Sequence, residues 1–104
     1  MITASFFKKN GKFNKFSING HSGYACEGED IVCAAVSAMV MLTANNITEG
    51  FSVPAKTLVD EETATVTLQL DGDNECGIKL ITGLYNELCN LVNDYPENIK
   101  VIVK

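Results

Sequence analysis

The fold is decided by residues 2–18, which read Ile-Thr-Ala-Ser-Phe-Phe-Lys-Lys-Asn-Gly-Lys-Phe-Asn-Lys-Phe-Ser-Ile. Apolar and polar side chains alternate on both sides of Asn10-Gly11, the strongest short signal for a two-residue hairpin turn. We therefore expect a strand over Ile2 to Lys9, paired antiparallel with a second strand over residues 12–18. This hairpin delivers the chain to Gly20.

A helix should follow, because Asp30 is a good N-cap residue and precedes a long apolar stretch. We expect it to run to about Asn45-Asn46, with Ile31, Val32 and Cys33 on its first turn. Apolar residues occupy almost every face of this helix. That pattern is typical of a helix buried on more than one side, here against a sheet and a second helix or subunit.

The remaining elements alternate in the same way. Residues 55–60 and 63–70 read as a hairpin that turns at residues 60–62, with Ala64, Val66, Leu68 and Leu70 on the apolar face. Residues 71–74 are a turn and cap, after which apolar residues recur at helical spacing up to Pro96, and Ile99 to Val103 form a last strand. The sequence predicts one α+β domain over residues 1–104, with two layers in the order ββαββαβ: two helices on an antiparallel or mixed sheet of about five strands.

Composition indicates a small domain that folds without metal or disulfide help. The chain has 104 residues, and 46% of them are hydrophobic. It contains no run of eighteen or more uncharged apolar residues, and its first residues lack the features of a secretory signal. We therefore expect a cytoplasmic protein with no membrane partner.

Four cysteines, Cys26, Cys33, Cys76 and Cys89, are to be interpreted in that reducing compartment, so a disulfide framework is not expected. Zinc is disfavoured because no C-x-x-C or H-x-x-x-H pair is present. We expect no metal and no cofactor, and we assign Cys76 and Cys89 to packing in the second helix.

Charge is unevenly distributed along the chain. The net charge is −5, from eight lysines, no arginine and 13 acidic residues, yet residues 1–19 contain four lysines and no acid. A negative balance without arginine argues against sequence-specific nucleic-acid binding, so no direct nucleic-acid partner is expected. An acidic surface suits a basic protein or peptide, although it is also ordinary for a soluble protein.

Chemistry is concentrated in residues 20–28, Gly-His-Ser-Gly-Tyr-Ala-Cys-Glu-Gly, and in the helix that follows. On the first turn of a helix, Cys33 would lie near unpaired N–H groups that favour a thiolate and can donate hydrogen bonds to a developing oxyanion. His21 is the only histidine and the only imidazole available for acid–base work. The alternatives are an inert packing cysteine and a solvated histidine.

Several neighbours have both structural and functional interpretations. Asp30 caps the helix or orients His21. The hydroxyl of Ser37, one turn after Cys33, either donates a hydrogen bond to a carbonyl of the preceding turn or supports the position of the nucleophile. Tyr24 is a lid or a substrate contact. Cys26 is a possible resolving thiol for Cys33 in a redox-sensing domain.

Taken together, Gly20-His21-Ser22-Gly23-Tyr24-Ala25, Gly28 and residues 30–37 (Asp-Ile-Val-Cys-Ala-Ala-Val-Ser) resemble the signature of the ribosomal-processing cysteine protease family Prp, the YsxB-like proteins. The resemblance implies an endopeptidase that removes an N-terminal extension from a basic protein of the large ribosomal subunit, the twenty-seventh. It implies a catalytic dyad at His21 and Cys33, supporting roles for Asp30 and Ser37, and a homodimer. Ser22 stands where the pattern has alanine, and Cys26 lies outside the pattern.

The glycines Gly20, Gly23 and Gly28 suggest that substrate binding orders this loop, with Tyr24, and so assembles the dyad. Two other functions compete with proteolysis. One is a non-catalytic ribosome-associated binding protein in which Cys33 is structural. The other is a redox sensor that uses Cys26 and Cys33.

Overall fold

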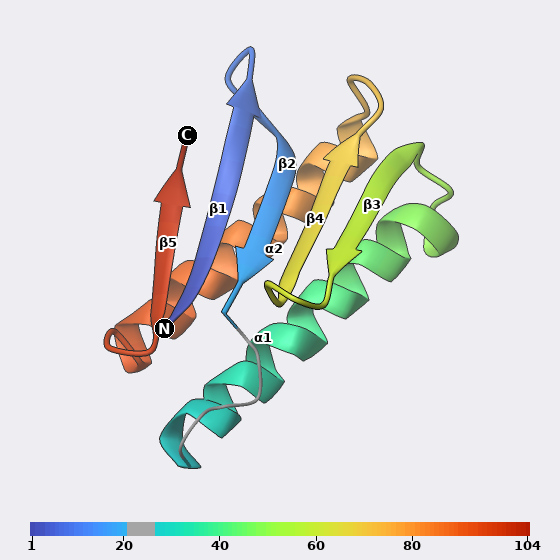
Figure 1. Cartoon of the computed structure of the whole chain (residues 1–104). Helices are drawn as coiled ribbons and strands as arrows, with labels where there is room; N and C mark the ends of the chain where they lie inside the picture. The colour runs from blue at the N-terminus through green and yellow to red at the C-terminus, as the bar shows by residue number, and fades with distance from the viewer. Residues whose placement is uncertain (21–26) are drawn as a thin grey trace.

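The computed structural model describes residues 1–20 and 27–104, with only the backbone described for residues 27–30. Two helices lie on the same face of a five-stranded sheet (Figure 1). The elements are β1 (Ile2–Lys9), β2 (Lys12–Asn19), α1 (Glu27–Asn45), η1 (Asn46–Gly50), β3 (Ala55–Asp60), β4 (Thr65–Leu70), α2 (Glu75–Asp94) and β5 (Ile99–Val103). The predicted α+β class and the order ββαββαβ are therefore confirmed.

The sheet is mixed, with the strand order β3-β4-β2-β1-β5. The central hairpin pairs Ala4 with Ile18 and Phe6 with Phe16, and β5 joins β1 in parallel after the crossover through α2. Asn10 and Gly11 have φ values of 55° and 79°. Positive φ at both turn residues is the geometry that favours Asn-Gly in a two-residue hairpin.

Strand register places the apolar side chains on the face that the helices cover. Phe6 is fully buried, and its ring contacts the rings of Phe13, Phe16 and Tyr85 at centroid separations of 5.3–6.3 Å. The helices contribute two matching rows of buried residues: Val32, Val36, Val40 and Ala44 from α1, and Ile81, Leu84 and Leu88 from α2. These rows form one core with the strands.

The second helix begins and ends as its sequence predicts. The side-chain oxygen of Asn74 accepts a hydrogen bond of 2.9 Å from the N–H of Gly77. The helix stops at Asp94, two residues before Pro96. Cys76 and Cys89 both lie on α2, half-buried.

Apart from the start of α1, two details differ from the sequence prediction. Ala64 belongs to the turn before β4, with φ 52°, and not to the apolar face of the strand. A π-helical turn, η1, continues α1 to Gly50 and buries Ile47. The stretch Ile31–Gly50, which runs from α1 through η1, has the length and composition of a membrane-crossing helix, but one side of it packs in the core.

Candidate active site

Cys33 lies at the border between the buried and the exposed sides of α1. Its side chain is half-buried and packs against the core, beside fully buried Val32. Ile31, two positions earlier, is 63% exposed. The thiol therefore lies where α1 passes from core contact to solvent, a position that a substrate can approach.

The predicted start of this helix is wrong. α1 begins at Glu27, so Asp30 is its fourth residue and not its N-cap, and Cys33 is its seventh. The sequence offers a physical reason, since Glu27, Glu29 and Asp30 are the acidic residue types that the positive end of a helix favours in its first turn.

This shift changes the electrostatics expected at Cys33. With a rise of 1.5 Å per residue, the backbone of Cys33 lies about 9 Å from that of Glu27. Unpaired N–H groups and the macrodipole act over the first turn only. Cys33 is therefore not on the first turn of α1, the position that the sequence-based expectation of an oxyanion site there requires.

Gly20 fixes the point at which the chain leaves the sheet. A Cβ atom there would lie 2.5 Å from the carbonyl oxygen of Met1, and φ is +97°. The N–H of Gly20 also donates to the carbonyl of Ala64 at 3.3 Å. The positive φ and the short distance from the Cβ position to Met1 both require glycine, so Gly20 is a close-packing position that anchors the chain immediately before His21.

The other loop residues predicted to act at the site, His21, Gly23 and Tyr24, lie outside the described residues, as do Ser22 and Cys26. Gly28 is the second residue of α1. The end of β2 and the first half of α1 lie toward the same end of the molecule (Figure 1). The two described ends of the segment that carries His21 are thus the glycine anchor and the helix of Cys33.

Ser37 follows Cys33 by one helical turn and is also half-buried. Residues four apart in a helix are neighbours on one face. The structure therefore brings Cys33 and Ser37 onto the same side of α1, the arrangement that a supporting role for Ser37 requires.

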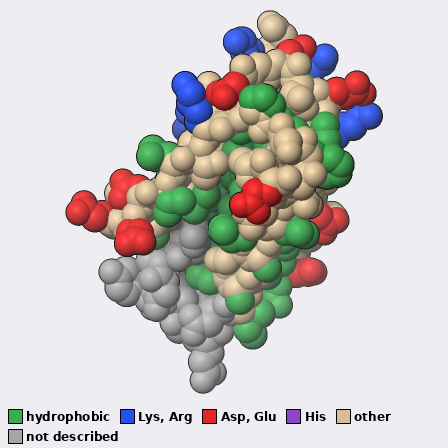
Figure 2. All heavy atoms as spheres, turned by 90° about the vertical axis from the view of Figure 1, so that its right-hand side faces the viewer, with side chains coloured by type: hydrophobic (Ala, Val, Ile, Leu, Met, Phe, Trp, Pro, Cys, Tyr) green, Lys and Arg blue, Asp and Glu red, His purple; other side chains and the backbone are tan. Residues whose placement is uncertain are grey.

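An exposed apolar stripe on α1 is a feature that the sequence analysis did not resolve. It consists of Ile31, Ala34, Ala38, Met41 and Leu42, the last two 51% and 64% exposed. Figure 2 shows hydrophobic side chains gathered on the side of the molecule formed by α1 and the β3 edge. Because the helix is apolar on almost every face, its sequence did not indicate which face remains exposed.

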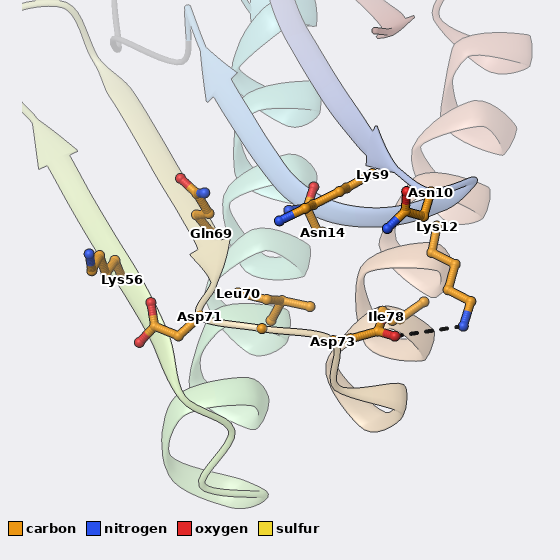
Figure 3. Close-up of a pocket in the computed structure, with 11 residues that line it drawn as sticks. Lys9, Asn10, Lys12, Asn14, Lys56, Gln69, Leu70, Asp71, Asp73 and Ile78 are labelled. Carbon is orange, nitrogen blue, oxygen red and sulfur yellow. Dashed lines mark ion pairs between the residues drawn. The ribbon is translucent and has the colours of Figure 1, made fainter.

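No cluster of three or more potential metal ligands occurs among residues 1–20 and 31–104, whose side chains the structure describes. A hollow of about 380 Å³ lies away from Cys33, between the β1–β2 hairpin, β3, β4 and the start of α2 (Figure 3). It is lined by lysine, amide and carboxylate side chains and contains no cysteine.

The family model described as cysteine protease Prp matches residues 1–100. A search of curated proteins gave no match. The structure is similar to that of SMU.848 from Streptococcus mutans, with 25% identity, a TM-score of 0.89 and coverage of 99% of this chain and 96% of that one.

Two structures of the essential ribosomal processing protease Prp from S. aureus are also similar over the full length of both chains. The complex with a covalently linked product peptide has 25% identity and a TM-score of 0.87. The complex with a substrate peptide has 24% identity and a TM-score of 0.91.

Proposed function

The chain belongs to the cysteine protease Prp family, and from this premise we propose that it is a ribosomal-processing endopeptidase whose catalytic dyad is Cys33 and His21. Its substrate is a precursor of the basic large-subunit ribosomal protein numbered twenty-seven, from which it removes the N-terminal extension in the cytoplasm. The family match over nearly the whole chain is the observation that carries the proposal.

In the proposed reaction, the sulfur of Cys33 attacks the scissile carbonyl carbon, and His21 donates a proton to the departing amine. The peptide C–N bond breaks and a thioester forms on Cys33. His21 then takes a proton from water, which attacks the thioester, and the released thiolate regenerates the dyad. The border position of Cys33 supports this role, because its sulfur is neither enclosed in the core nor fully solvated.

The neighbouring residues support the dyad in this proposal. Ser37 holds the face of α1 that carries Cys33, and Asp30, three positions before Cys33, orients His21. Gly23 and Tyr24 belong to the segment that the substrate orders, which begins at the anchor Gly20 and leads to Gly28 in the first turn of α1. Substrate binding then assembles the dyad and limits the cleavage of other proteins.

A basic substrate fits the charge of the chain. Of its 13 acidic residues, only Asp60 lies in a strand, so the helices and loops carry the negative charge. The site belongs to this acidic side, since α1 and the segment before it supply Cys33 and His21. Charge complementarity speeds the encounter and disfavours acidic partners.

We also propose that the protein acts as a homodimer. The exposed stripe on α1 supports this, since Ile31 and Leu42 are each more than 60% exposed on a helix whose opposite face is core. Contiguous exposed apolar surface of this kind marks interaction sites in soluble proteins. A second copy that covers the stripe would bury α1 on more than one side.

The direct test is incubation with the extended ribosomal protein from the same genome, followed by mass measurement of the products. We expect one cut that removes the extension, no cut with Cys33→Ala or His21→Ala, and normal cutting with Cys76→Ala, a half-buried cysteine on α2. Unchanged cutting by Cys33→Ala would refute the dyad. Absence of cutting by the wild-type chain, with binding retained, would favour a non-catalytic ribosome-associated protein.

A further inference from the structure

The helix-free face of the sheet carries a different chemistry from the rest of the molecule. Both helices cover one face, so no described helix lies over the opposite face of the five strands (Figure 1). Strand pairing places Ser5, Ser17 and Thr67 side by side on this open face. The hydroxyls of Ser17 and Thr67 are 3.1 Å apart.

Positive charge is concentrated on the sheet, although the chain is acidic overall. Six of the eight lysines lie in strands, and Lys104 directly follows β5. Asp60 is the one acidic residue in any strand. The net charge of −5 therefore conceals a basic sheet beside acidic helices and loops.

One transverse row on the open face combines these charges with an aromatic ring. The register aligns Phe7, Lys15, Gln69 and Lys56 on the adjacent strands β1, β2, β4 and β3. Lys104 extends the row on the β5 side. We refer to these five residues as the Phe7 row, and at 4.7–4.9 Å per strand it spans about 19 Å.

Phe7 is the aromatic member of this row, and two cations lie at its ring. The ammonium nitrogens of Lys15 and Lys104 are 4.7 Å and 5.5 Å from the ring centroid. Lys15 lies on β2 and Lys104 follows β5, the strands on the two sides of β1, so the ring of Phe7 brings together two positive charges that are distant in sequence. Two ammonium groups beside a half-buried aromatic ring offer contacts to phosphate and to a base at one point.

The hollow at the hairpin end of the sheet continues the row. It shares Lys56 and Gln69 with the row and adds Lys9 and Asn14 (Figure 3). At its far side it also contains the carboxylates of Asp71 and Asp73, the second of which pairs with Lys12 at 4.0 Å. Its volume of about 380 Å³ is within the range of small-ligand sites. The amides of Asn14 and Gln69 are donors and acceptors of the kind that recognise the edge of an unstacked base.

We propose that this open face binds single-stranded RNA, with Lys15, Lys104 and Lys56 on phosphates and a base stacked on Phe7. An acidic peptide would use the lysines alone, whereas the ring, the amides and the row of hydroxyls also match bases and 2′-hydroxyls. The absence of arginine argues against sequence-specific recognition of duplex DNA. It does not argue against the binding of single-stranded RNA, which relies on base stacking and on point charges. The proposal does not depend on peptide cleavage.

The test is fluorescence anisotropy of a labelled oligouridylate with the full chain, between about 50 and 200 mM salt. We expect Lys15→Gln/Lys104→Gln to weaken binding about fivefold to tenfold and to lower the salt slope by about 1.4, as for two lost contacts to a single strand. Phe7→Leu should weaken binding with no change in slope. The control, Lys8→Gln/Lys79→Gln, removes two lysines outside the row and should bind like the wild type.

Two further measurements keep the proposal open to refutation if a variant unfolds. Photocrosslinking of 4-thiouridine RNA to the wild-type chain should label peptides from β1 and β2, whereas crosslinks confined to other elements would overturn the assignment. Polyglutamate should compete far less well than RNA, and equal competition would identify an acidic peptide as the occupant. No binding at about 50 mM salt would also overturn it.

Discussion

Gly20 and Met1 approach each other so closely that a Cβ atom on Gly20 would lie 2.5 Å from the carbonyl oxygen of Met1. The contact joins the end of β2 to the start of β1, two interior strands, at the end of the sheet from which the segment with His21 departs. The first residue of the chain thus helps to set where the candidate active site begins.

Replacing this glycine should cost more than replacing another glycine with positive φ. Gly20→Ala combines a left-handed backbone at φ +97° with the Met1 contact, so we expect the free energy of unfolding to fall by about 2–4 kcal/mol. Gly11→Ala, at φ +79° with nothing within 4 Å, should lose only about 1 kcal/mol. Denaturant unfolding measures both, and equal losses would show that the contact with Met1 does not restrict the site.

The start of α2 depends on one side-chain cap. Asn74→Ala removes the acceptor of the Gly77 N–H bond, and we expect the free energy of unfolding to fall by about 1 kcal/mol. Asn74→Asp keeps an acceptor oxygen and should be close to the wild type. Asn86→Ala, an exposed position within α2, is the control and should cause no loss. A loss as large for Asn86→Ala would argue against the cap.

Tyr85 should titrate later than an ordinary tyrosine. A hydrogen bond with Cys89, the charge of that thiol when ionised, and burial all raise the pKa of Tyr85 above 10.0. The folded state thus favours the neutral phenol, so this contribution to stability is complete below pH 10 and is lost as the pH rises through the raised pKa. Cys89→Ala should lower the pKa of Tyr85, followed by phenolate absorbance, whereas Cys76→Ala should leave it unchanged.

The apolar stripe on α1 should control self-association. Leu42→Glu places a charge in the stripe, so sedimentation should show the proposed dimer shifting to a monomer. Leu58→Glu is the matched control, since Leu58 is 69% exposed on β3 and lies outside the stripe. If Leu58→Glu dissociates the dimer and Leu42→Glu does not, the subunits associate through the sheet edge instead.

The elements that the sequence predicted well are those whose structure is specified by residues close together in the sequence. The Asn10-Gly11 turn, the alternation around Phe6 and Phe16, and the cap at Asn74 each specify their element without reference to distant residues. The start of α1 was predicted four residues late because Gly28 favours a loop while its acidic neighbours favour a first helical turn. Local preferences conflict there, and the structure resolves them toward the helix.

The candidate site was predicted as residues but not as an arrangement. The Gly-His pair and the helix of Cys33 are recognisable in sequence, yet the position of Cys33 on the second turn follows from where α1 begins. The basic open face could not be predicted from net charge, because only strand register shows that Lys15 and Lys56 share a face with Phe7. A single composition value averages over both sides of the molecule.

The central claim is that Cys33 forms the covalent bond to substrate. The most direct measurement is mass spectrometry of the chain quenched during cleavage of the extended ribosomal protein, followed by mapping of the adduct. We predict an acyl group of the extension's mass on the peptide that contains Cys33, absent from Cys33→Ala and retained in Cys89→Ala. Cleavage that proceeds with an adduct on another residue, or with full activity in Cys33→Ala, would contradict the account.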